Sequence, residues 1–136
     1  MRIVLDTNIF ISGIFWTSSP SGKIILAWRR GVFMLITSNP ILKELVDKLS
    51  SFKIEMDKQM IEEWKQIIVQ NAIVVKPSMK LNIVKDDPDD NMFLEAAIEG
   101  NADYIVSQDK HLLKVSTYKN VKILTPKDFL GLLNRS

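Results

Sequence analysis

Several features are missing from this 136-residue sequence, and each absence removes a class of protein. It contains no cysteine, which excludes disulfides, thiol catalysis and cysteine-ligated zinc and fits a reducing compartment. No apolar run approaches the ~20 residues that a membrane helix needs. The N-terminus lacks the order of a signal peptide, because Asp6 interrupts its apolar stretch almost at once. We therefore expect a cytoplasmic protein without a membrane anchor.

Glycine and histidine are too scarce for several familiar sites. The five glycines are scattered, and none of them belongs to a phosphate-binding loop or a dinucleotide motif. The single histidine, His111, cannot supply a zinc triad, and no Ser-His-Asp arrangement stands out. The three tryptophans are best interpreted as core or interface residues. The acidic residues remain as the main carriers of chemistry.

The overall composition is that of a soluble globular protein, with 46% hydrophobic and 25% charged residues. Its length predicts one domain spanning residues 1–136. The net charge is only +2, and the pI is about 8.8. If several acids gather in one site, the remaining surface must be basic, which suits a polyanionic substrate. Lysines scattered over the surface for solubility explain the same numbers equally well.

Apolar runs of strand length alternate with amphipathic stretches of helix length. The predicted strands are Ile3–Leu5, Phe33–Ile36, Ala72–Val75, Tyr104–Val106 and Val121–Leu124. Helix starts are expected at Asn39-Pro40 and Thr125-Pro126, and residues 76–85 are expected to form a connecting loop. This alternation predicts an α/β fold with a mostly parallel sheet and helices on both faces.

The acids fall where such a fold would gather them. Asp6 closes the first strand, and Asp109 follows the fourth strand by a few residues. An acidic run, Asp86-Asp87-Pro88-Asp89-Asp90, precedes the helical stretch 91–100. Ligands bind beyond the carboxyl ends of parallel strands. Clustered carboxylates repel one another unless a cation lies between them. A divalent-metal site with phosphoester chemistry is therefore the first hypothesis.

Each acid also has a purely structural interpretation. Asp6 and Asp109 could cap the helices that follow them. Acids in the run before residue 91 favour a helix start, although four acids in five residues exceed that need. Asp90 is our first choice to point inward and Asp87 the second, with Asp89 left open. Glu44 is adequately explained by a solvated ion pair with Lys48 at i+4.

Four pieces of the sequence, in order and at plausible spacing, resemble the PIN-domain nucleases. They are the strand ending in Asp6-Thr7-Asn8, Glu44 in the helix after Ser38-Asn39-Pro40, Asp87-Pro88-Asp89-Asp90-Asn91, and the segment 102–113 with Ser107-Gln108-Asp109. The resemblance covers nearly the whole chain. It is greatest to the subgroup described as toxin components of prokaryotic toxin–antitoxin modules.

The resemblance implies a three-layer α/β/α sandwich with about five strands and a metal-dependent endoribonuclease. It assigns an acidic quartet for one or two Mg²⁺ or Mn²⁺ ions and the supporting polar groups Asn8 and Ser107. Asp87 is added as a supporting group from the acidic run, and four lysines are candidates for the RNA backbone because they lie close to the acids in the sequence. The quartet is Asp6, Glu44, Asp90 and Asp109; the supporting groups are Asn8, Ser107 and Asp87; the lysines are Lys23, Lys43, Lys110 and Lys114. Members of the subgroup often carry another acid at the position of His111.

The resemblance also implies partners. The substrate would be single-stranded or looped RNA, cut to leave 5′-phosphate and 3′-hydroxyl ends, and a cognate antitoxin would cover the acidic cleft. A homodimer could use Ile14, Phe15 and Trp16. Two alternatives remain open within the fold: a non-catalytic RNA- or partner-binding domain, and a stand-alone RNA-processing nuclease. A phosphatase on a similar sheet is a third, and the neutral Asn8 in place of a second Asp counts against it.

Overall fold

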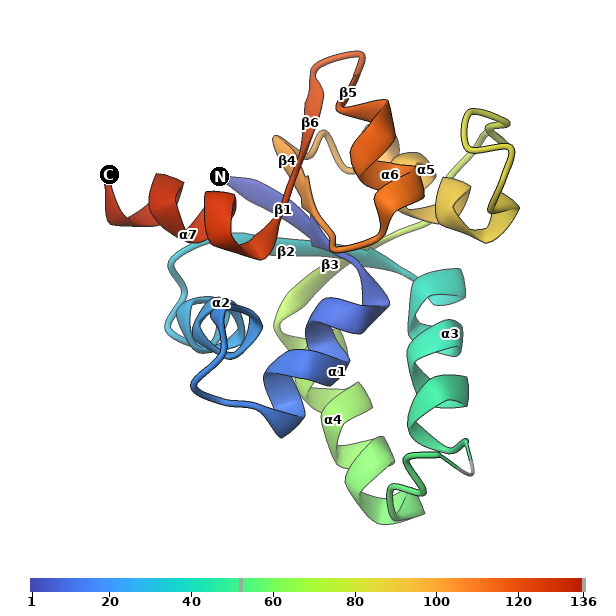
Figure 1. Cartoon of the computed structure of the whole chain (residues 1–136). Coiled ribbons are helices and arrows are strands. Elements are labelled where there is room, and N and C mark those ends of the chain that lie inside the picture. Colours follow the sequence, from blue (N-terminus) through green and yellow to red (C-terminus); the bar gives the residue numbers. More distant parts are fainter. Residues whose placement is uncertain (52, 136) are drawn as a thin grey trace.

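The computed structural model describes residues 1–51 and 53–135, and a six-stranded sheet lies at its centre (Figure 1). The strands are β1 (Arg2–Leu5), β2 (Met34–Ser38), β3 (Ala72–Val75), β4 (Tyr104–Val106), β5 (Thr117–Tyr118) and β6 (Val121–Leu124). Their order across the sheet is β3-β2-β1-β4-β6-β5. All neighbouring pairs are parallel except β5 with β6, which is antiparallel. The mostly parallel sheet is as predicted, and the two-residue β5 is the strand that no apolar run marks.

Helices connect the strands and cover the sheet. They are α1 (Thr7–Phe15), α2 (Pro20–Arg29), α3 (Asn39–Leu49), α4 (Lys58–Gln70), α5 (Asn91–Glu99), α6 (Lys110–Val115) and α7 (Pro126–Asn134), with a short 3₁₀ turn η1 (Pro88–Asp90) before α5. Among the described residues, no helix is both long and apolar enough to cross a membrane. The segment 76–87 between β3 and η1 contains no regular element, as predicted for a loop.

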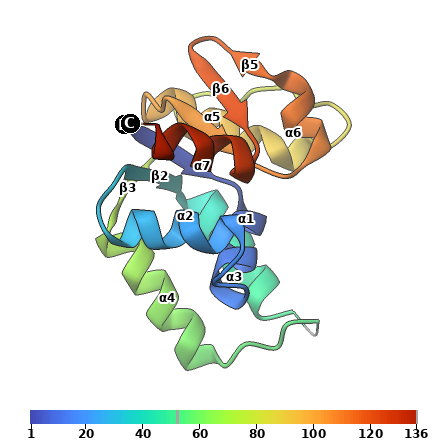
Figure 2. The same cartoon turned by 60° about the vertical axis from the view of Figure 1, so that its left-hand side comes forward.

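Two hydrophobic clusters, one on each face of the sheet, produce the three layers. Ile3 and Leu5 of β1 lie in the cluster with α1–α4 and α7, whereas Val4 lies in the cluster with α5 and α6. This split follows from the strand geometry, since successive side chains point to opposite faces. Figures 1 and 2 show the same division from two directions, with α5 and α6 on one side of the sheet and α1–α4 on the other.

Local capping residues set where the helices begin. Thr125 accepts a hydrogen bond from the backbone N–H of Asp128 at 3.1 Å, and Pro126 begins α7, as predicted. In α3 the cap is Ser38 and not the expected Asn39, because the Ser38 hydroxyl faces the N–H of Ile41. Ser19-Pro20 uses the same device to start α2. The chain order places α1 and α3 directly after β1 and β2, and α6 a short loop after β4, so that these three helices begin at the carboxyl edge of the sheet.

Candidate metal centre

Asp6 lies at the carboxyl end of β1, where the chain turns into α1. Its backbone N–H still bonds to Val106 of β4 at 3.0 Å, which holds the residue at the sheet edge. One carboxylate oxygen accepts the backbone N–H of Asn8 at 3.2 Å, so Asp6 does cap α1. The other accepts the Ser107 hydroxyl at 2.6 Å. The side chain is only 3% exposed, which is rare for an acid and leaves it facing the interior of the site.

Ser107 couples Asp6 to Asp109. Its hydroxyl donates to Asp6 and accepts the backbone N–H of Asp109 at 2.9 Å. The Asp109 carboxylate in turn accepts the backbone N–H of His111 at 2.7 Å and caps α6. Because each group is held by its neighbour, the two acids that follow β1 and β4 have defined orientations.

Asp109 meets the acidic run of η1. Asp87, Asp90 and Asp109 each offer a carboxylate oxygen, and these oxygens lie within 4.8 Å of one another. Asp90 is 6% exposed, and its Oδ2 is buried without a hydrogen-bond partner in the described part of the chain. A buried, unpartnered carboxylate oxygen is costly. Hard divalent cations prefer such oxygen ligands, so these residues fit a Mg²⁺ or Mn²⁺ ion.

Electrostatics supports the same arrangement. Burial, a hydrogen bond with Asp109 and the charges of Asp109, Asp87 and Asp6 raise the pKa of Asp90 to about 8. Burial also raises the pKa of Asp6, although bonds from Ser107 and Asn8 and the charge of Lys48 partly oppose it. Without a cation Asp90 therefore keeps its proton at neutral pH, because four carboxylates cannot all ionise side by side at low cost.

Glu44 lies outside this group. Its carboxylate contacts the Lys48 ammonium at 3.3 Å, and Lys48 also contacts the side-chain oxygen of Asn8 at 3.3 Å. Glu44 and Lys48 line a cleft of about 430 Å³ between α3 and the start of α5, which we call the α3 cleft. Asp89, which is exposed, lines the same cleft. The structure thus brings Asp6, Asp90 and Asp109 together with Asp87. Glu44 lies beside this group and forms an ion pair with Lys48.

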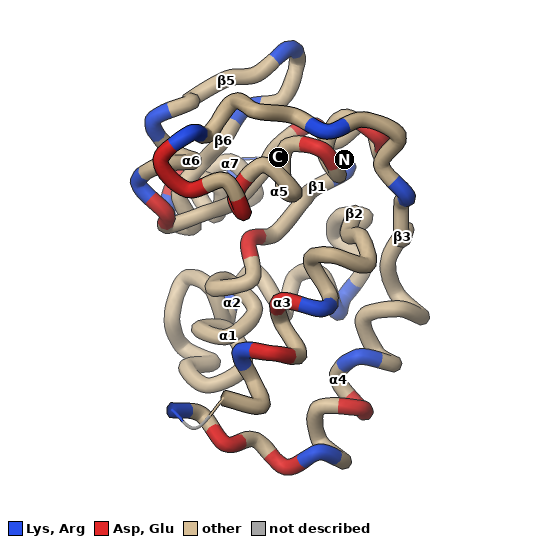
Figure 3. Tube along the Cα trace, turned by 90° about the vertical axis from the view of Figure 1, so that its right-hand side faces the viewer, with Lys and Arg blue, Asp and Glu red and all other residues tan. Residues whose placement is uncertain are grey.

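The four lysines proposed for RNA have different surroundings. Lys43 pairs with Asp47 on the outer side of α3 at 2.9 Å. Lys110 and Lys114 are exposed on α6. Figure 3 shows basic positions on α6 beside a stretch of acidic ones. Lys23 is exposed on α2, whose main packing partners are α1 and α7. Lys114 lines a cleft together with Asp86, and Lys43 lines the α3 cleft together with Glu44 and Asp89.

Asn91 is a residue of this site whose role the sequence interpretation missed. Its buried amide accepts the N–H groups of Ile83 and Val84 and donates to the carbonyls of Val84 and Pro88, all within 3.0 Å. These bonds hold the irregular segment and η1 against α5. The signal was present, because Asn91 lies on the side of α5 that also carries Leu94 and so had to be buried.

Comparisons with known proteins agree with this geometry. Residues 2–111 match the family described as PIN domain. A relative, the uncharacterized protein MJ1680 of Methanocaldococcus jannaschii, is 30% identical over 144 residues, which cover 96% of this chain and 90% of that protein. Among solved structures, the fold is similar to a chain in the crystal structure of VapBC2 from Rickettsia felis bound to a DNA fragment from their promoter. The TM-score is 0.60 at 19% identity, and the match covers 92% of this chain and 98% of that one.

Proposed function

This chain belongs to the PIN-domain nuclease family, and from that premise we propose that it is a metal-dependent endoribonuclease, the toxin component of a toxin–antitoxin module. The observation that carries the metal dependence is the buried, unpartnered Oδ2 of Asp90 amid the carboxylates of Asp87 and Asp109. A buried polar atom without a partner calls for an explanation, and a bound cation supplies one at this position. The RNA preference rests on the family resemblance, and a cytoplasmic location is part of the same proposal.

The acids divide the work between them. Asp87, Asp90 and Asp109 would hold one or two Mg²⁺ or Mn²⁺ ions, with Asp6 completing the set from the end of β1. When bound, such an ion supplies Lewis-acid chemistry for hydrolysis of a phosphodiester bond. Asp90 must first release its proton, since its pKa of about 8 leaves it neutral in the free protein. Ser107 keeps Asp6 and Asp109 oriented.

Lys48 has a supporting electrostatic role in this proposal. Its ammonium lies against Glu44 and Asn8, and its charge partly offsets the rise in the pKa of Asp6 that burial causes. A fixed positive charge here limits the repulsion among the carboxylates and keeps Asp6 ready to accept a cation. Glu44 therefore acts on the site through Lys48 and Asn8, at the mouth of the α3 cleft.

The test is cleavage of a labelled single-stranded RNA in Mg²⁺ or Mn²⁺. We expect Asp90→Asn and Asp109→Asn each to lower the rate at least about 100-fold, because an amide cannot replace a charged ligand. Asp128→Asn is the matched control, since Asp128 is an exposed acid in the first turn of α7. Its rate should equal that of the parent protein.

Four results would each redirect the proposal, and the first three concern binding and catalysis. Equal cleavage by the parent, Asp90→Asn and Asp109→Asn would contradict the metal centre. RNA binding without any cleavage would favour a non-catalytic domain. Turnover of small phosphomonoesters in place of RNA would favour a phosphatase.

A second experiment tests the antitoxin. We expect a toxin to copurify with a small protein encoded by the adjacent reading frame and to be inhibited by that protein. A nuclease that is not inhibited would be a stand-alone RNA-processing enzyme.

A further inference from the structure

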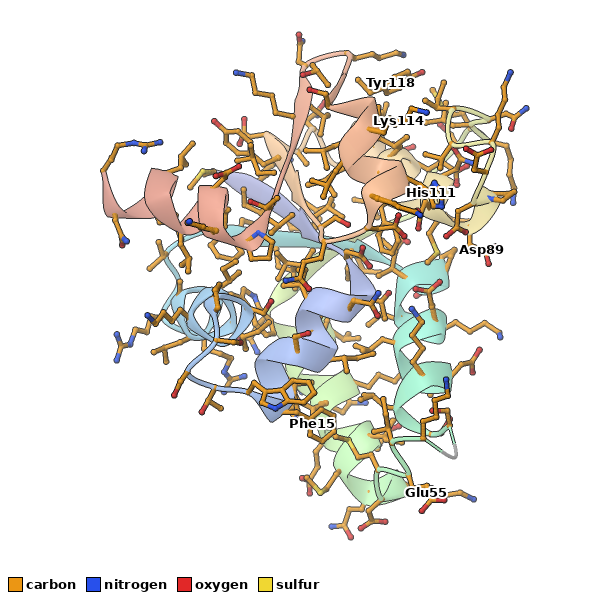
Figure 4. The ribbon with its side chains drawn as sticks, viewed as in Figure 1. Phe15, Glu55, Asp89, His111, Lys114 and Tyr118 are labelled. Carbon is orange, nitrogen blue, oxygen red and sulfur yellow. The ribbon has the colours of Figure 1, made fainter. Side chains whose placement is uncertain are left out.

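A second cleft, of about 370 Å³, lies beside the acids on the side of α6, and we call it the α6 cleft. Its volume falls within the ~300–1,000 Å³ that is usual for ligand pockets. Apolar and charged side chains share its lining: Val84, Lys85, Asp86, His111, Lys114 and Val115. In Figure 4, His111 and Lys114 lie on α6 and extend toward the segment that precedes η1.

The two walls of the α6 cleft continue into the metal centre. One wall is residues 83–86, directly before Asp87 and Asp90. The other is α6, which begins immediately after Asp109. The His111 backbone N–H even bonds to the Asp109 carboxylate at 2.7 Å. A chain bound at the acids can therefore pass directly into this cleft.

The irregular wall is held in place. Val84 is pinned by the Asn91 amide at 2.9 and 3.0 Å, and the N–H of Leu81 bonds to the Glu95 carboxylate at 2.9 Å. Val84 is 4% exposed and packs in the core on the α5 side of the sheet. The cleft is thus preorganised, which reduces the entropy lost when a ligand binds.

Charge distinguishes the α6 cleft from the α3 cleft. Lys85 and Lys114 outnumber the single acid Asp86 and form no ion pair in the described part of the chain. In the α3 cleft, by contrast, both lysines are already paired with Asp47 and Glu44, and Asp89 adds a further negative charge. An anionic ligand is therefore favoured in the α6 cleft and opposed in the α3 cleft.

We propose that the α6 cleft is a subsite for one nucleotide of single-stranded RNA next to the phosphodiester that is cut. Lys85 and Lys114 bind its phosphates, while the base lies against the His111 ring and the apolar wall of Val84 and Val115. Unstacked RNA bases bind in this way to aromatic and apolar side chains. The subsite rests on the proposed nuclease function and adds the direction that the strand takes: along α6, away from α3.

The phosphate contacts are tested by binding of a fluorescent RNA of about ten nucleotides, measured by anisotropy in the Asp90→Asn background so that the substrate stays intact. The logarithm of the binding constant falls as the logarithm of the salt concentration rises. Loss of two phosphate contacts should make this slope shallower by about 1.4 and weaken binding up to about 25-fold at 0.1 M salt. We therefore expect these changes in the Lys85→Gln/Lys114→Gln variant.

The matched control is Lys122→Gln/Lys127→Gln, which removes the same charge from exposed positions on β6 and α7. It should bind with a nearly unchanged slope. Equal losses in both double variants would mean diffuse surface attraction and would overturn the subsite. An unchanged slope in Lys85→Gln/Lys114→Gln would overturn it as well. Circular dichroism of each variant confirms that the fold is intact.

The base contact is tested at His111. His111→Ala keeps the backbone N–H that holds Asp109, so any loss comes from the ring. We expect binding about fivefold weaker or more, with an unchanged salt slope, and recovery in His111→Phe, which retains a stacking surface. If the His111→Ala variant binds RNA as tightly as its parent, the proposed contact between the base and His111 is wrong.

The outcomes separate the subsite from the function on which it rests. A parent protein that neither binds nor cleaves RNA contradicts the nuclease proposal itself. A parent that cleaves RNA, loses cleavage in Asp90→Asn, and binds RNA equally well with or without Lys85 and Lys114 contradicts only the subsite. Loss of binding in the cleft variants alone, with the parent active, supports both.

Discussion

Ser107 connects two of the acids, Asp6 and Asp109. It is fully buried at the end of β4, and it bonds at once to the Asp6 carboxylate and the Asp109 backbone. The two partners come from segments about 100 residues apart in the sequence. The hydroxyl therefore fixes the position of the acid after β1 relative to the acid after β4. Groups that orient metal ligands in this way affect a site nearly as strongly as the ligands.

Replacing Ser107 should therefore weaken the site without removing an acid. In Ser107→Ala, Asp6 loses the hydrogen bond that lowers its pKa, and the Asp109 N–H loses its acceptor. We expect Mn²⁺ affinity, measured by calorimetry, and RNA cleavage to fall about 10- to 100-fold. Ser50→Ala, which removes a serine–backbone bond at the exposed end of α3, is the control and should change neither. Full activity of Ser107→Ala would show that Asp6 needs no such orientation.

Among the elements, the irregular segment 76–87 has the closest connection to the site. It contains no helix or strand, yet side chains of α5 bind its backbone at four residues: Glu99 at Ser78, Glu95 at Leu81, and Asn91 at both Ile83 and Val84. These bonds satisfy backbone groups that would otherwise form hydrogen bonds with a neighbouring strand. They position both η1, with Asp87 and Asp90, and the wall of the α6 cleft.

Asn91→Ala should release this segment. The buried N–H and C=O of Val84 would lose their partners, which costs about 1–3 kcal/mol for each buried group left unsatisfied. We expect a lower free energy of unfolding in urea and faster amide hydrogen exchange at residues 81–88. Asn71→Ala is a suitable comparison, because that exposed amide makes one bond within the end of α4. Exchange at 81–88 that is unaffected by Asn91→Ala would mean that the core contacts of Val84 suffice.

At the scale of the whole molecule, the clustered acids set how stability depends on pH. The folded protein keeps a proton on Asp90 up to about pH 8, whereas the unfolded chain releases it near the ordinary value of 3.8. The folded state therefore binds more protons between these values, and stability falls as pH rises through this window. A bound cation relieves the repulsion among the carboxylates, because its positive charge takes the place of the proton on Asp90.

We accordingly expect the metal-free protein to lose stability from pH 5 to pH 8, by at most about 1.4 kcal/mol per pH unit from Asp90. Asp90→Asn should flatten this dependence, and Asp128→Asn should leave it unchanged. Millimolar Mn²⁺ should raise the melting temperature of the parent more at pH 8 than at pH 6. A parent and an Asp90→Asn variant with the same pH profile would contradict the raised pKa.

Homodimer formation stays a prediction at this scale. Phe15 and Trp16, at the end of α1, are 45% and 64% exposed, while Ile14 is partly buried. The ring centroids of Phe15 and Trp16 lie 6.2 Å apart. The two rings form a small apolar surface on the α1–α4 side of the molecule, where Figure 4 labels Phe15. Such a surface can serve a partner or a second copy.

Local sequence alone determined the strands and much of the capping. Runs such as Ile3–Leu5 and Tyr104–Val106 are apolar throughout because both sheet faces are covered, and this pattern is visible without any tertiary information. The positions of Asp6 and Asp109 after strand ends followed directly. The start of α2 at Ser19-Pro20 carried the same local signal as α7 and was overlooked. The short β5 left no signal, since its pairing with β6 needs only two residues.

Only the tertiary structure decided how the acids share the site. Within Asp86–Asp90, sequence cannot tell which carboxylate turns inward, because that depends on the rotation of η1, which Asn91 and the burial of Val84 set from outside the run. The residues alone explain Glu44 as an ion pair with Lys48, and the family resemblance adds it to the acidic quartet. In the fold Glu44 contacts Lys48 and lines the α3 cleft, and its role as a metal ligand stays a prediction. Strand periodicity is a local property of the chain. The directions of side chains that meet across 40 to 100 residues are set by packing.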